Sequence, residues 1–370
     1  MAVAGQGVGV SERVLMTTIA EWSRKVSEET TRNLVLFAML QKKGKISYGH
    51  SGGNMRWPVR TAEHPTTGFV DMEPITVQRR NTKTNAYLGW RGQRADDLIS
   101  LQEKLENAGP EAMVKVFEGR EELIREAAIR DLALQVYEDG DTPTNSAANR
   151  FHGLETFMTI GAQTATDLIA TTHNDTYAGL STVVGTVGGS ATDTKTNRLW
   201  TPVIINTSHT PTAGIKNWAD YAVEYIREML IRGTYGQGPS ERMDLVMLNR
   251  SAYTDLLNLM DDKERILVNR GSGEELVSLG FKNIVEIDGI PVTWDFGCPD
   301  TDGNSDTVRG YGLNTSKIEF CVLGPKGQKK LFDSRIDFNV NYHADQISLW
   351  LLGNFKFQSP RHFGKLADIT

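Results

Sequence analysis

Two short motifs contain residue types that perform catalysis in other proteins. The pentapeptide Gly49-His50-Ser51-Gly52-Gly53 matches G-x-S-x-G, in which a serine nucleophile follows a buried strand and precedes a helix. Neither element is expected around Ser51, because Asn54-Met55-Arg56-Trp57-Pro58 comes next. The run Gly5-Gln6-Gly7-Val8-Gly9 matches part of a nucleotide-binding loop without a preceding strand. We interpret the first motif as a glycine turn and the second as a disordered terminus.

Potential metal ligands are present without the spacing that a metal site requires. The seven histidines never recur at ligand spacing, and Cys298 and Cys321 belong to no Cys-x-x-Cys or Cys/His pattern. The run Asp261-Asp262-Lys263-Glu264-Arg265 indicates a solvated helix end. Part of a calcium loop, without its closing bidentate glutamate, is formed by Asp300, Asp302, Asn304 and Asp306. We therefore predict buried reduced cysteines, a polar turn at 300–306, and no catalytic, cofactor-binding or metal site.

The composition limits the classes of protein to which the chain can belong. A chain of 370 residues with 39% hydrophobic and 23% charged residues is long enough for one large or two ordinary domains. The net charge of −6 disfavours a dedicated nucleic-acid binder, which needs many cations to replace phosphate counterions. No segment approaches the roughly 18 apolar residues of a membrane span, and the first residues lack the features of a signal peptide. An intracellular protein without a membrane partner is expected.

The N-terminal third of the chain changes character near residue 46. Apolar residues at three- and four-residue steps predict helices at 11–26 and 33–40, which together form an arm. From 46 to 94, glycines and prolines exclude helix, and short strands at 75–77 and 86–88 flank the polar run QRRNTKTN. This long two-stranded loop is basic: residues 56–94 hold seven cations and three carboxylates, a local charge of +4.

A long acidic helix follows the basic loop. Residues 110–138 form one amphipathic pattern with Pro110 in the first turn and Gly140 past the end. A helix of this length spans about 44 Å. Residues 96–139 hold twelve carboxylates and five cations, a local charge of −7. The two neighbouring regions are thus opposite in charge.

The rest of the chain predicts a mixed α/β part followed by strands. Loops and short strands are expected over 159–211. Helices are predicted at 218–232 and 251–260, with a buried strand at 245–248 between them. Alternation of apolar and polar residues predicts C-terminal strands around 318–322, 336–342 and 347–351, with a turn at 343–345. The fold class is therefore α+β.

The two-stranded loop points to an assembling protein. An isolated hairpin is marginally stable in water, and this one has few apolar residues with which to form a core, so it needs another surface to lie on. The chain also has no set of reactive groups. A subunit of an assembly explains both observations better than an enzyme does.

The order of these parts resembles the major capsid proteins of tailed bacteriophages, which have the Hong Kong 97-like fold. Nearly the whole chain takes part in the resemblance. The segments that carry it are His152-Gly153-Leu154-Glu155 after the long helix, Leu245-Val246-Met247-Leu248 with its following helix, Gly280-Phe281, Ile287-Asp288-Gly289-Ile290-Pro291-Val292, and Tyr311-Gly312-Leu313-Asn314-Thr315.

The resemblance implies five parts and a structural role. They are an N-terminal arm (1–48), an extended loop (49–95), a peripheral domain with the spine helix (96–154), an axial domain (155–310) and the C-terminal strands of the peripheral domain (311–370). It implies pentamers and hexamers of the chain in an icosahedral virion capsid around double-stranded DNA, assembled in the host cytoplasm without catalysis or sequence-specific DNA binding. Separate scaffold, portal and decoration proteins are the implied partners.

In relatives the extended loop lies over a neighbouring subunit, and the charges supply a physical reason for the same contact here. The alternative is that both charged regions are simply solvated. The residues expected in this contact are Arg56, Arg60, Arg79, Arg80, Lys83, Arg91, Glu118, Glu122 and Glu126.

Some relatives join subunits by a Lys-Asn isopeptide bond that a buried glutamate promotes. Lys83 with Asn339 or Asn341 would be the reacting pair, but no glutamate follows Glu319 in the last strands, so no such crosslink is expected. Two other functions stay open. One is an encapsulin-type nanocompartment shell protein of the same fold, and the other is an intracellular α/β enzyme with its site in 155–310.

Overall fold

The structure is a computed structural model that describes most of the chain. The described residues are 35–62, 68–71, 79, 81–102, 110–141, 150–159, 167–169, 175–184, 186–187, 199–210, 216–235, 238–261, 284–302, 306–325, 327, 331–339 and 344–369. The helix predicted at 11–26 and the strand predicted at 75–77 lie outside them. No helix within these ranges is long and apolar enough to cross a membrane.

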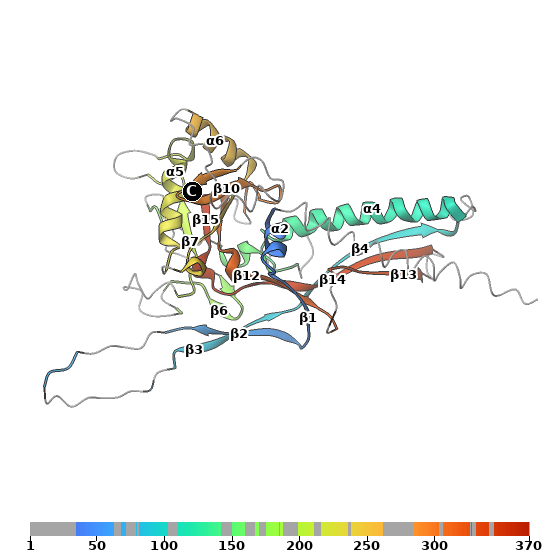
Figure 1. The fold of residues 1–370 in the computed structure, drawn as a ribbon, viewed down its shortest axis with the longest axis horizontal. Coiled ribbons are helices and arrows are strands. Elements are labelled where there is room, and N and C mark those ends of the chain that lie inside the picture. Colours follow the sequence, from blue (N-terminus) through green and yellow to red (C-terminus); the bar gives the residue numbers. More distant parts are fainter. Residues whose placement is uncertain are drawn as a thin grey trace, which may run out of the picture.

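A five-stranded sheet forms a long platform, with strand order β1-β12-β14-β13 and β4 paired to β14. Its strands are β1 (Ile46–His50), β4 (Arg91–Ser100), β12 (Ile318–Leu323), β13 (Asp333–Asn339) and β14 (Ala344–Phe357). The longest helix, α4 (Pro110–Gln135), runs along this sheet (Figure 1). Ile124 of α4 packs in a cluster with Ile99, Ile347 and Leu349 of the strands. Helix and sheet therefore stabilise each other along one face.

A six-stranded sheet forms the second layer, in the order β7-β15-β11-β8-β10-β9. Its strands are β7 (Val203–Asn206), β8 (Leu245–Leu248), β9 (Val285–Ile287), β10 (Ile290–Trp294), β11 (Thr307–Leu313) and β15 (Gly364–Asp368). Val246 and Leu248 pack in one cluster with helix α5 (Trp218–Arg232) and helix α6 (Arg250–Asp261). Leu245 and Met247 point into the main core on the other face. Burial on both faces explains the continuous apolar run of β8.

Shorter elements complete the fold. They are α2 (Val35–Lys42), the two-stranded pair β5 (Thr176–Tyr177) and β6 (Leu180–Ser181), and the 3-10 turns η1 (Leu154–Phe157), η2 (Pro239–Glu241), η3 (Thr315–Lys317) and η4 (Pro360–His362). Two of them, η3 and η4, join strands of one sheet to strands of the other. Between the sheets, the rings of Phe157, Tyr177, Phe357 and Phe363 contact one another. This aromatic centre fixes the start of the segment after α4 against the last strands.

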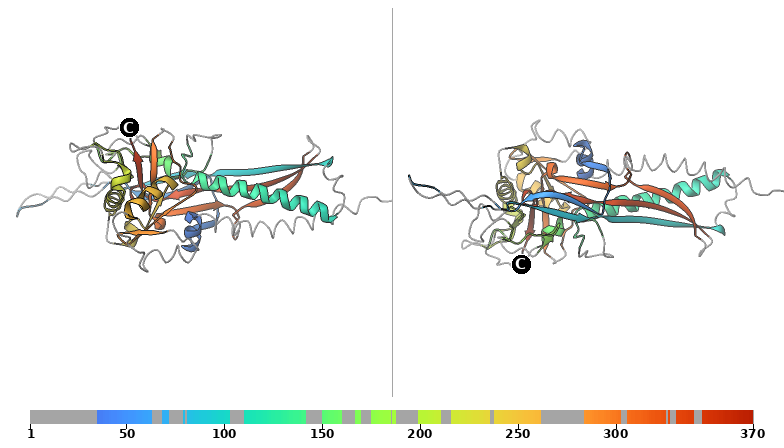
Figure 2. Two further views of the ribbon diagram at one scale, coloured as in Figure 1. Left: turned by 90° about the horizontal axis from the view of Figure 1, so that it is seen from above. Right: turned by 90° about the horizontal axis from the view of Figure 1, so that it is seen from below.

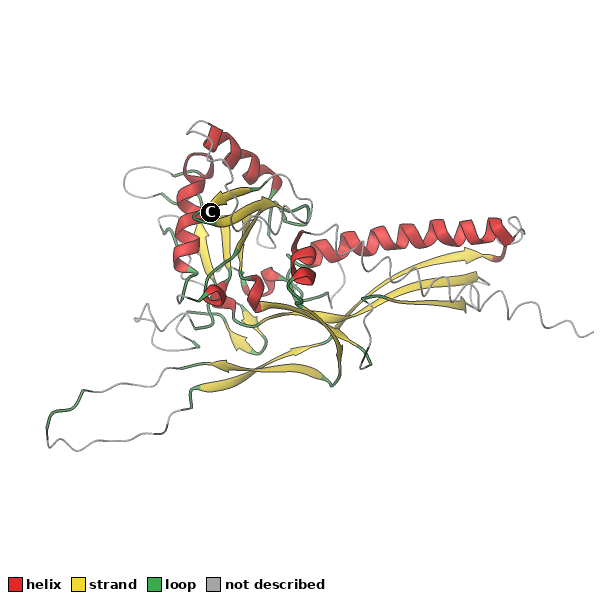
Figure 3. Cartoon of the chain, in the orientation of Figure 1, coloured by secondary structure: helices red, strands yellow, loops and turns green. Residues whose placement is uncertain are grey.

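The third part is a hairpin of β2 (Asn54–Arg60) and β3 (Lys83–Gly89), paired antiparallel along their full length. It extends from the body on the side opposite to the far end of α4, as the three views show (Figures 1 and 2). The colouring by secondary structure shows the same division into a hairpin, a platform under one helix, and a compact part with α5 and α6 (Figure 3).

Most sequence predictions of elements are confirmed, with some differences. The helix predicted at 110–138 ends at Gln135, where the chain turns. The partner of the strand around 86–88 is β2, whereas only short extended pieces were predicted for that part of the chain. Strand β4 was not predicted. Strands β13 and β14 form a C-terminal hairpin as predicted, but Ala344 and Asp345, expected in its turn, are paired residues of β14. Strand β12 also pairs with β14, so the three strands are not a simple meander.

The sheets do not follow the expected domain boundaries completely. Strand β15 lies within 311–370, yet it pairs with β7 and β11 of the six-stranded sheet. The last strand therefore returns to the part of the molecule that the sequence assigned to residues 155–310. Cys298 and Cys321 are buried and not bonded to each other, as predicted.

Candidate assembly surface

The base of the hairpin has one buried and one exposed face. Along β2 the side chains alternate strictly between exposed and buried, and the buried ones are Met55, Trp57 and Val59. Ala86 and Leu88 of β3 are buried on the same side. The proline within β2, Pro58, is compatible with a two-stranded ribbon that has free edges. The sequence therefore encodes a ribbon that lies on a surface.

That surface belongs, at the base, to the same chain. The ring centroids of Trp57 and Tyr177 are 6.5 Å apart, and Trp57 Nε1 donates a hydrogen bond of 3.2 Å to the carbonyl of Gln358. The backbone N–H of Tyr87 donates to the carbonyl of Ala178 at 3.0 Å. The expectation that the hairpin has nothing of its own to pack against was wrong for this half, because the aromatic centre extends beneath it.

A groove of about 380 Å³ lies between the hairpin base and the body. Its cationic lining residues are Arg60, Lys317, Lys356 and Arg361. Glu241 accepts from Lys317 at 3.5 Å and lies 3.5 Å from the Arg361 guanidinium, and Glu319 accepts from Lys356 at 2.9 Å. The groove is thus basic but partly neutralised from within the subunit.

Most described residues beyond the base are exposed, and the hairpin leaves the body there (Figure 1). Phe69 and Val70 are each 74% exposed, an unusual state for two adjacent large apolar side chains. Arg56, Arg79 and Lys83 are also exposed. Because the hairpin and the far end of α4 point in opposite directions, these residues do not reach the acidic helix of their own chain (Figure 1).

The predicted contact residues on α4 are only partly open. Glu122 and Glu126 are exposed, and Glu122 makes a 3.5 Å contact with Arg125 one turn away. The side chain of Glu118 and the whole of Arg80 lie outside the described residues. Other carboxylates of the acidic region have partners in the chain: Asp97 pairs with Arg120 at 3.0 Å, and Arg150 pairs with Asp131 and, at 2.9 Å, with Glu138. Arg120 and Arg125 are already counted in the total of −7, whereas Arg150 lies outside residues 96–139, so its two ion pairs offset part of the negative charge.

Arg91 differs from the other predicted contact residues. Its guanidinium pairs with Asp141 at 2.8 Å and donates to the carbonyl of Gly140 at 3.1 Å, both in its own chain. Arg94 stacks on Trp350 at 4.9 Å and pairs with Asp96 at 2.5 Å. These cations belong to β4, which the sequence treated as part of the loop. The structure brings Arg56, Arg60, Arg79 and Lys83 together on the hairpin and leaves Arg91 engaged elsewhere.

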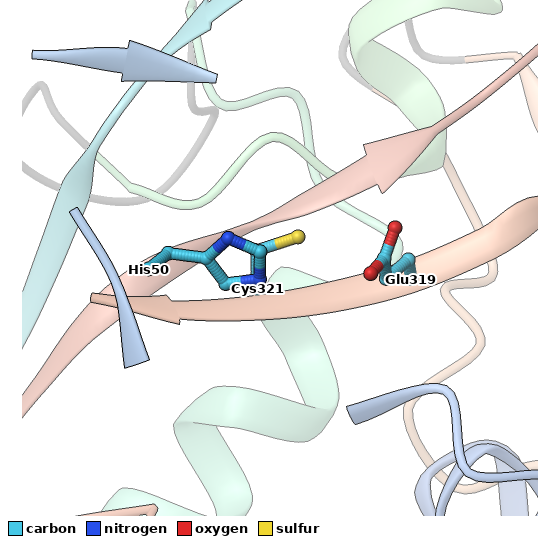
Figure 4. A group of neighbouring side chains, drawn as sticks. All are labelled: His50, Glu319 and Cys321. Carbon is cyan, nitrogen blue, oxygen red and sulfur yellow. The ribbon is translucent and has the colours of Figure 1, made fainter. Parts of the chain in front are cut away.

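One group of potential metal ligands gathers among the described residues: His50, Glu319 and Cys321 (Figure 4). Ser47 Oγ lies 2.5 Å from His50 Nε2 and 2.9 Å from Glu319 Oε1. Burial raises the pKa of the Cys321 thiol to about 11, and the Lys356 ammonium already pairs with Glu319. The hydrogen bonds of Ser47 and the ion pair of Lys356 with Glu319 form a polar network that ties β1 to β12 and β14.

Two other sequence motifs can be compared with the structure, while residues 5–9 and most of the run 261–265 lie outside the described residues. A strand, β1, does precede Ser51, but β2 follows it in place of the helix that a nucleophile elbow requires. Asp302 of the partial calcium motif is buried and its carboxylate accepts from Lys365 Nζ at 2.7 Å. Asn304 lies outside the described residues.

The sequence did not reveal the buried polar cluster around Lys365. Lys365 Nζ also donates to Glu155 Oε2 at 2.8 Å, and Tyr311 donates to Glu155 Oε1 at 2.6 Å. Lys365 is fully buried. Glu155, Tyr311 and Asp302 come from η1, β11 and the loop before β11, so no local sequence pattern could have predicted that they meet Lys365.

Comparison with known proteins identifies the fold. No family model and no curated protein matches the sequence. Among solved structures, the capsid of a native GTA particle matches with a TM-score of 0.51 at 8% identity, over 89% of each chain. The capsid of the empty GTA particle gives 0.50 at 8% identity, again over 89% of each chain. The capsid of cyanophage A-1(L) gives 0.53 at 15% identity, over 88% of this chain and 90% of that one.

The architecture is therefore that of capsid subunits. More particularly, the chain has the Hong Kong 97-like fold of tailed-phage capsid proteins, as the sequence predicted: a long helix on a platform of strands, a projecting hairpin and a compact α/β part. The identity of 8–15% extends this conclusion to the fold alone.

Proposed function

We propose that the protein is a major capsid protein, many copies of which close an icosahedral shell around double-stranded DNA. The observation that carries this proposal is the hairpin: its base is anchored on the body, and its exposed apolar and cationic residues project where only another molecule meets them. A negative net charge of −6 suits a container whose wall does not bind the genome tightly. The role is structural and needs no catalysis.

In this proposal the parts have the roles that the resemblance implies. Residues 1–48 are the N-terminal arm and 49–95 the extended loop. The peripheral domain comprises 96–154 and most of 311–370, and the axial domain comprises 155–310 together with β15. Pentamers and hexamers form in the host cytoplasm and become the virion capsid, with separate scaffold, portal and decoration proteins as partners.

Within a pentamer or hexamer, the basic hairpin lies on the acidic α4 region of a neighbour. Arg56, Arg60, Arg79, Arg80 and Lys83 supply the cations. The facing carboxylates are Glu118, Glu122 and Glu126. Charge complementarity of this kind sets register and encounter rate more than affinity. Arg91 contributes through its ion pair within the subunit and is the weakest member of the predicted set.

Electron microscopy and sedimentation of the purified protein test the main proposal. We expect closed shells, and nuclease-resistant double-stranded DNA in particles taken from the natural source. Shells that hold an enzyme and little DNA would identify an encapsulin-type compartment. A small monodisperse species at every concentration, with or without a co-expressed scaffold, would favour the intracellular enzyme and remove the proposal.

A charge swap tests the contact between subunits. Reversal of Arg79, Arg80 and Lys83 to Glu is expected to reduce shell yield by about tenfold or more at low salt, because electrostatic steering is lost. Reversal of Glu118, Glu122 and Glu126 to Arg should do the same. The combined variant should recover assembly, which a general effect on solubility would not produce. Unchanged yield and salt dependence in the first variant would disprove the contact.

A further inference from the structure

The buried cluster around Lys365 contains more carboxyl groups than ammonium groups. One ammonium lies between two carboxyl groups, Glu155 at 2.8 Å and Asp302 at 2.7 Å. The Lys365 and Asp302 side chains are 0% and 1% exposed. If all three groups are ionised, the buried cluster carries one uncompensated negative charge, which a low-dielectric interior strongly disfavours. Condensation of Lys365 with Asp302 leaves this net charge unchanged, but it replaces two of the three buried ionised groups by a neutral amide and leaves Glu155, hydrogen-bonded to Tyr311, as the one remaining carboxylate.

We infer that Lys365 and Asp302 form an isopeptide bond within the subunit, with Glu155 as the residue that transfers the protons. The Lys365 Nζ lone pair attacks Asp302 Cγ, the bond from Cγ to Oδ2 breaks, and Oδ2 leaves as water. Of the three ammonium hydrogens, one stays on the amide nitrogen and two leave with the water. Ammonium and carboxylate become amide and water, so atoms and charge balance without an oxidant or other reactant.

Glu155 is placed to act as the base. Both carboxylates raise the pKa of Lys365 although burial alone would lower it, so the lysine begins as an ammonium and must lose a proton before it attacks. Glu155 Oε2 accepts the hydrogen bond from Nζ, and Tyr311 holds Oε1. Burial raises the pKa of Glu155, which makes its carboxylate a more effective proton acceptor.

Asp302 is placed to act as the electrophile. Its Oδ2 contacts Nζ, while Oδ1 accepts the backbone N–H of Asp306 at 2.9 Å. That N–H stabilises the negative charge that develops on Oδ1 in the tetrahedral intermediate. The fold holds the amine and carboxyl at contact distance, which replaces an improbable encounter by a step within one molecule. Exclusion of water from the cluster then protects the amide from hydrolysis.

The second lysine–carboxylate contact provides an internal comparison. Lys356 lies 2.9 Å from Glu319, but these side chains are 19% and 23% exposed. Ser47 and His50 also lie beside Glu319, but among the described residues Glu319 is the one carboxylate paired with Lys356, so no second carboxylate takes the place that Glu155 has beside Lys365. Distance alone therefore does not predict a bond, and we expect none between Lys356 and Glu319.

The intact mass of the purified, denatured protein tests the inference, and the result does not depend on assembly. The wild type should be lighter than its sequence by one water molecule, and protease digestion should give a branched peptide that joins Lys365 to Asp302. Glu155→Gln should restore the full mass. Glu319→Gln, the matched control, should still lack one water. A wild-type chain of full mass would overturn the inference whether or not any variant folds.

One side reaction must be separated from the bond. Asp302 precedes Gly303, and an Asp-Gly pair also loses water when it forms a succinimide. Hydroxylamine opens a succinimide and leaves an isopeptide bond intact, and Lys365→Arg removes only the latter. Water loss that persists in Lys365→Arg, or a wild-type chain that hydroxylamine converts into a hydroxamate or cleaves at the Asp-Gly bond, would assign the change to the succinimide and reject the isopeptide bond.

Discussion

The six-stranded sheet and the β2–β3 hairpin are two ways of using β-structure in one chain. Strands β7 and β8 are buried at every position, because helices α5 and α6 cover one face and the main core covers the other. Strand β2 alternates between buried and exposed, with one face on the body and one in solvent. The subunit buries the sheet along its central strands, whereas it packs against the hairpin only at the hairpin base.

The sheet is a part of the fold whose two faces the subunit itself covers, and the hairpin is a part that leaves one face open to solvent. A sheet covered on both faces derives its stability from the chain itself and should respond to mutation in every state of assembly. A ribbon with one free face and an exposed end contributes little to the fold beyond its anchor. Its sequence is then available for contacts with another copy, which is the role that we propose for it.

The largest effect is expected inside the six-stranded sheet. Leu248→Ala removes a fully buried side chain and leaves a cavity, so the free energy of unfolding should fall by about 3 to 5 kcal/mol. Urea denaturation of the unassembled subunit measures it. Leu257→Ala on α6 is the matched control, since Leu257 is 38% exposed and should lose far less. Equal losses would mean that the sheet is not the stable part of the fold.

Removal of the hairpin anchor should have the next largest effect. Trp57→Ala deletes the side chain that packs near Tyr177, at an expected cost of about 1.5 to 3 kcal/mol, the range for burial of a large side chain. The groove beside it opens to solvent and no closed cavity remains. Hydrogen exchange should show lost protection in β2 and β3 and unchanged protection in β8. Loss of protection throughout would show that the hairpin is part of the core.

A smaller effect is expected where the hairpin approaches the body at Gly179. Its φ of +77° is unfavourable for other residues, and a Cβ there would lie 2.4 Å from the Tyr87 ring. Gly179→Ala should cost about 1 to 2 kcal/mol for the backbone alone. Gly44→Ala is the matched control, because Gly44 has a φ of +64° and open space around it. If the two variants lose equal stability, the contact with Tyr87 contributes nothing.

The smallest effect concerns His152, which lies between the two regions. Burial lowers its pKa from 6.5 to about 4, so between these values the unfolded chain binds a proton that the folded chain does not. Stability should therefore fall on acidification, by about 1 kcal/mol from pH 6.5 to 5.5. Asp175, whose pKa burial raises to about 6, acts in the opposite direction. The difference between wild type and His152→Gln isolates the histidine, and identical pH profiles would contradict the prediction.

The sequence predicted best the elements whose own residues decide their structure. Helix α5 occupies the predicted residues, α6 extends one residue further at each end, and β8 coincides with its apolar run. The helices carry a complete periodic pattern, and β8 is one uninterrupted apolar run. The Asp288-Gly289 pair of the family resemblance forms the turn between β9 and β10, where both residues adopt a positive φ that this pair tolerates.

The errors have one physical cause, which is contact between distant segments. Strand β4 was missed because Arg91–Ser100 is largely polar, and it becomes a strand through its ten-residue pairing with β14. Phe338 fits the predicted alternation of β13 but is 58% exposed. The Lys365 cluster joins residues up to 210 positions apart. Nothing near Lys365 indicates a buried lysine.

The fourteen-residue strand β14 has a mechanical consequence. It pairs with β4, β13 and β12, and at about 3.4 Å per residue it extends for nearly 50 Å. A force applied at the outer end of the platform would therefore be transmitted along the β14 backbone to the aromatic centre. It would act in shear on the hydrogen bonds that join β14 to its three neighbouring strands. A shell wall built from such strands would resist internal pressure, because the tension would be distributed over many hydrogen bonds.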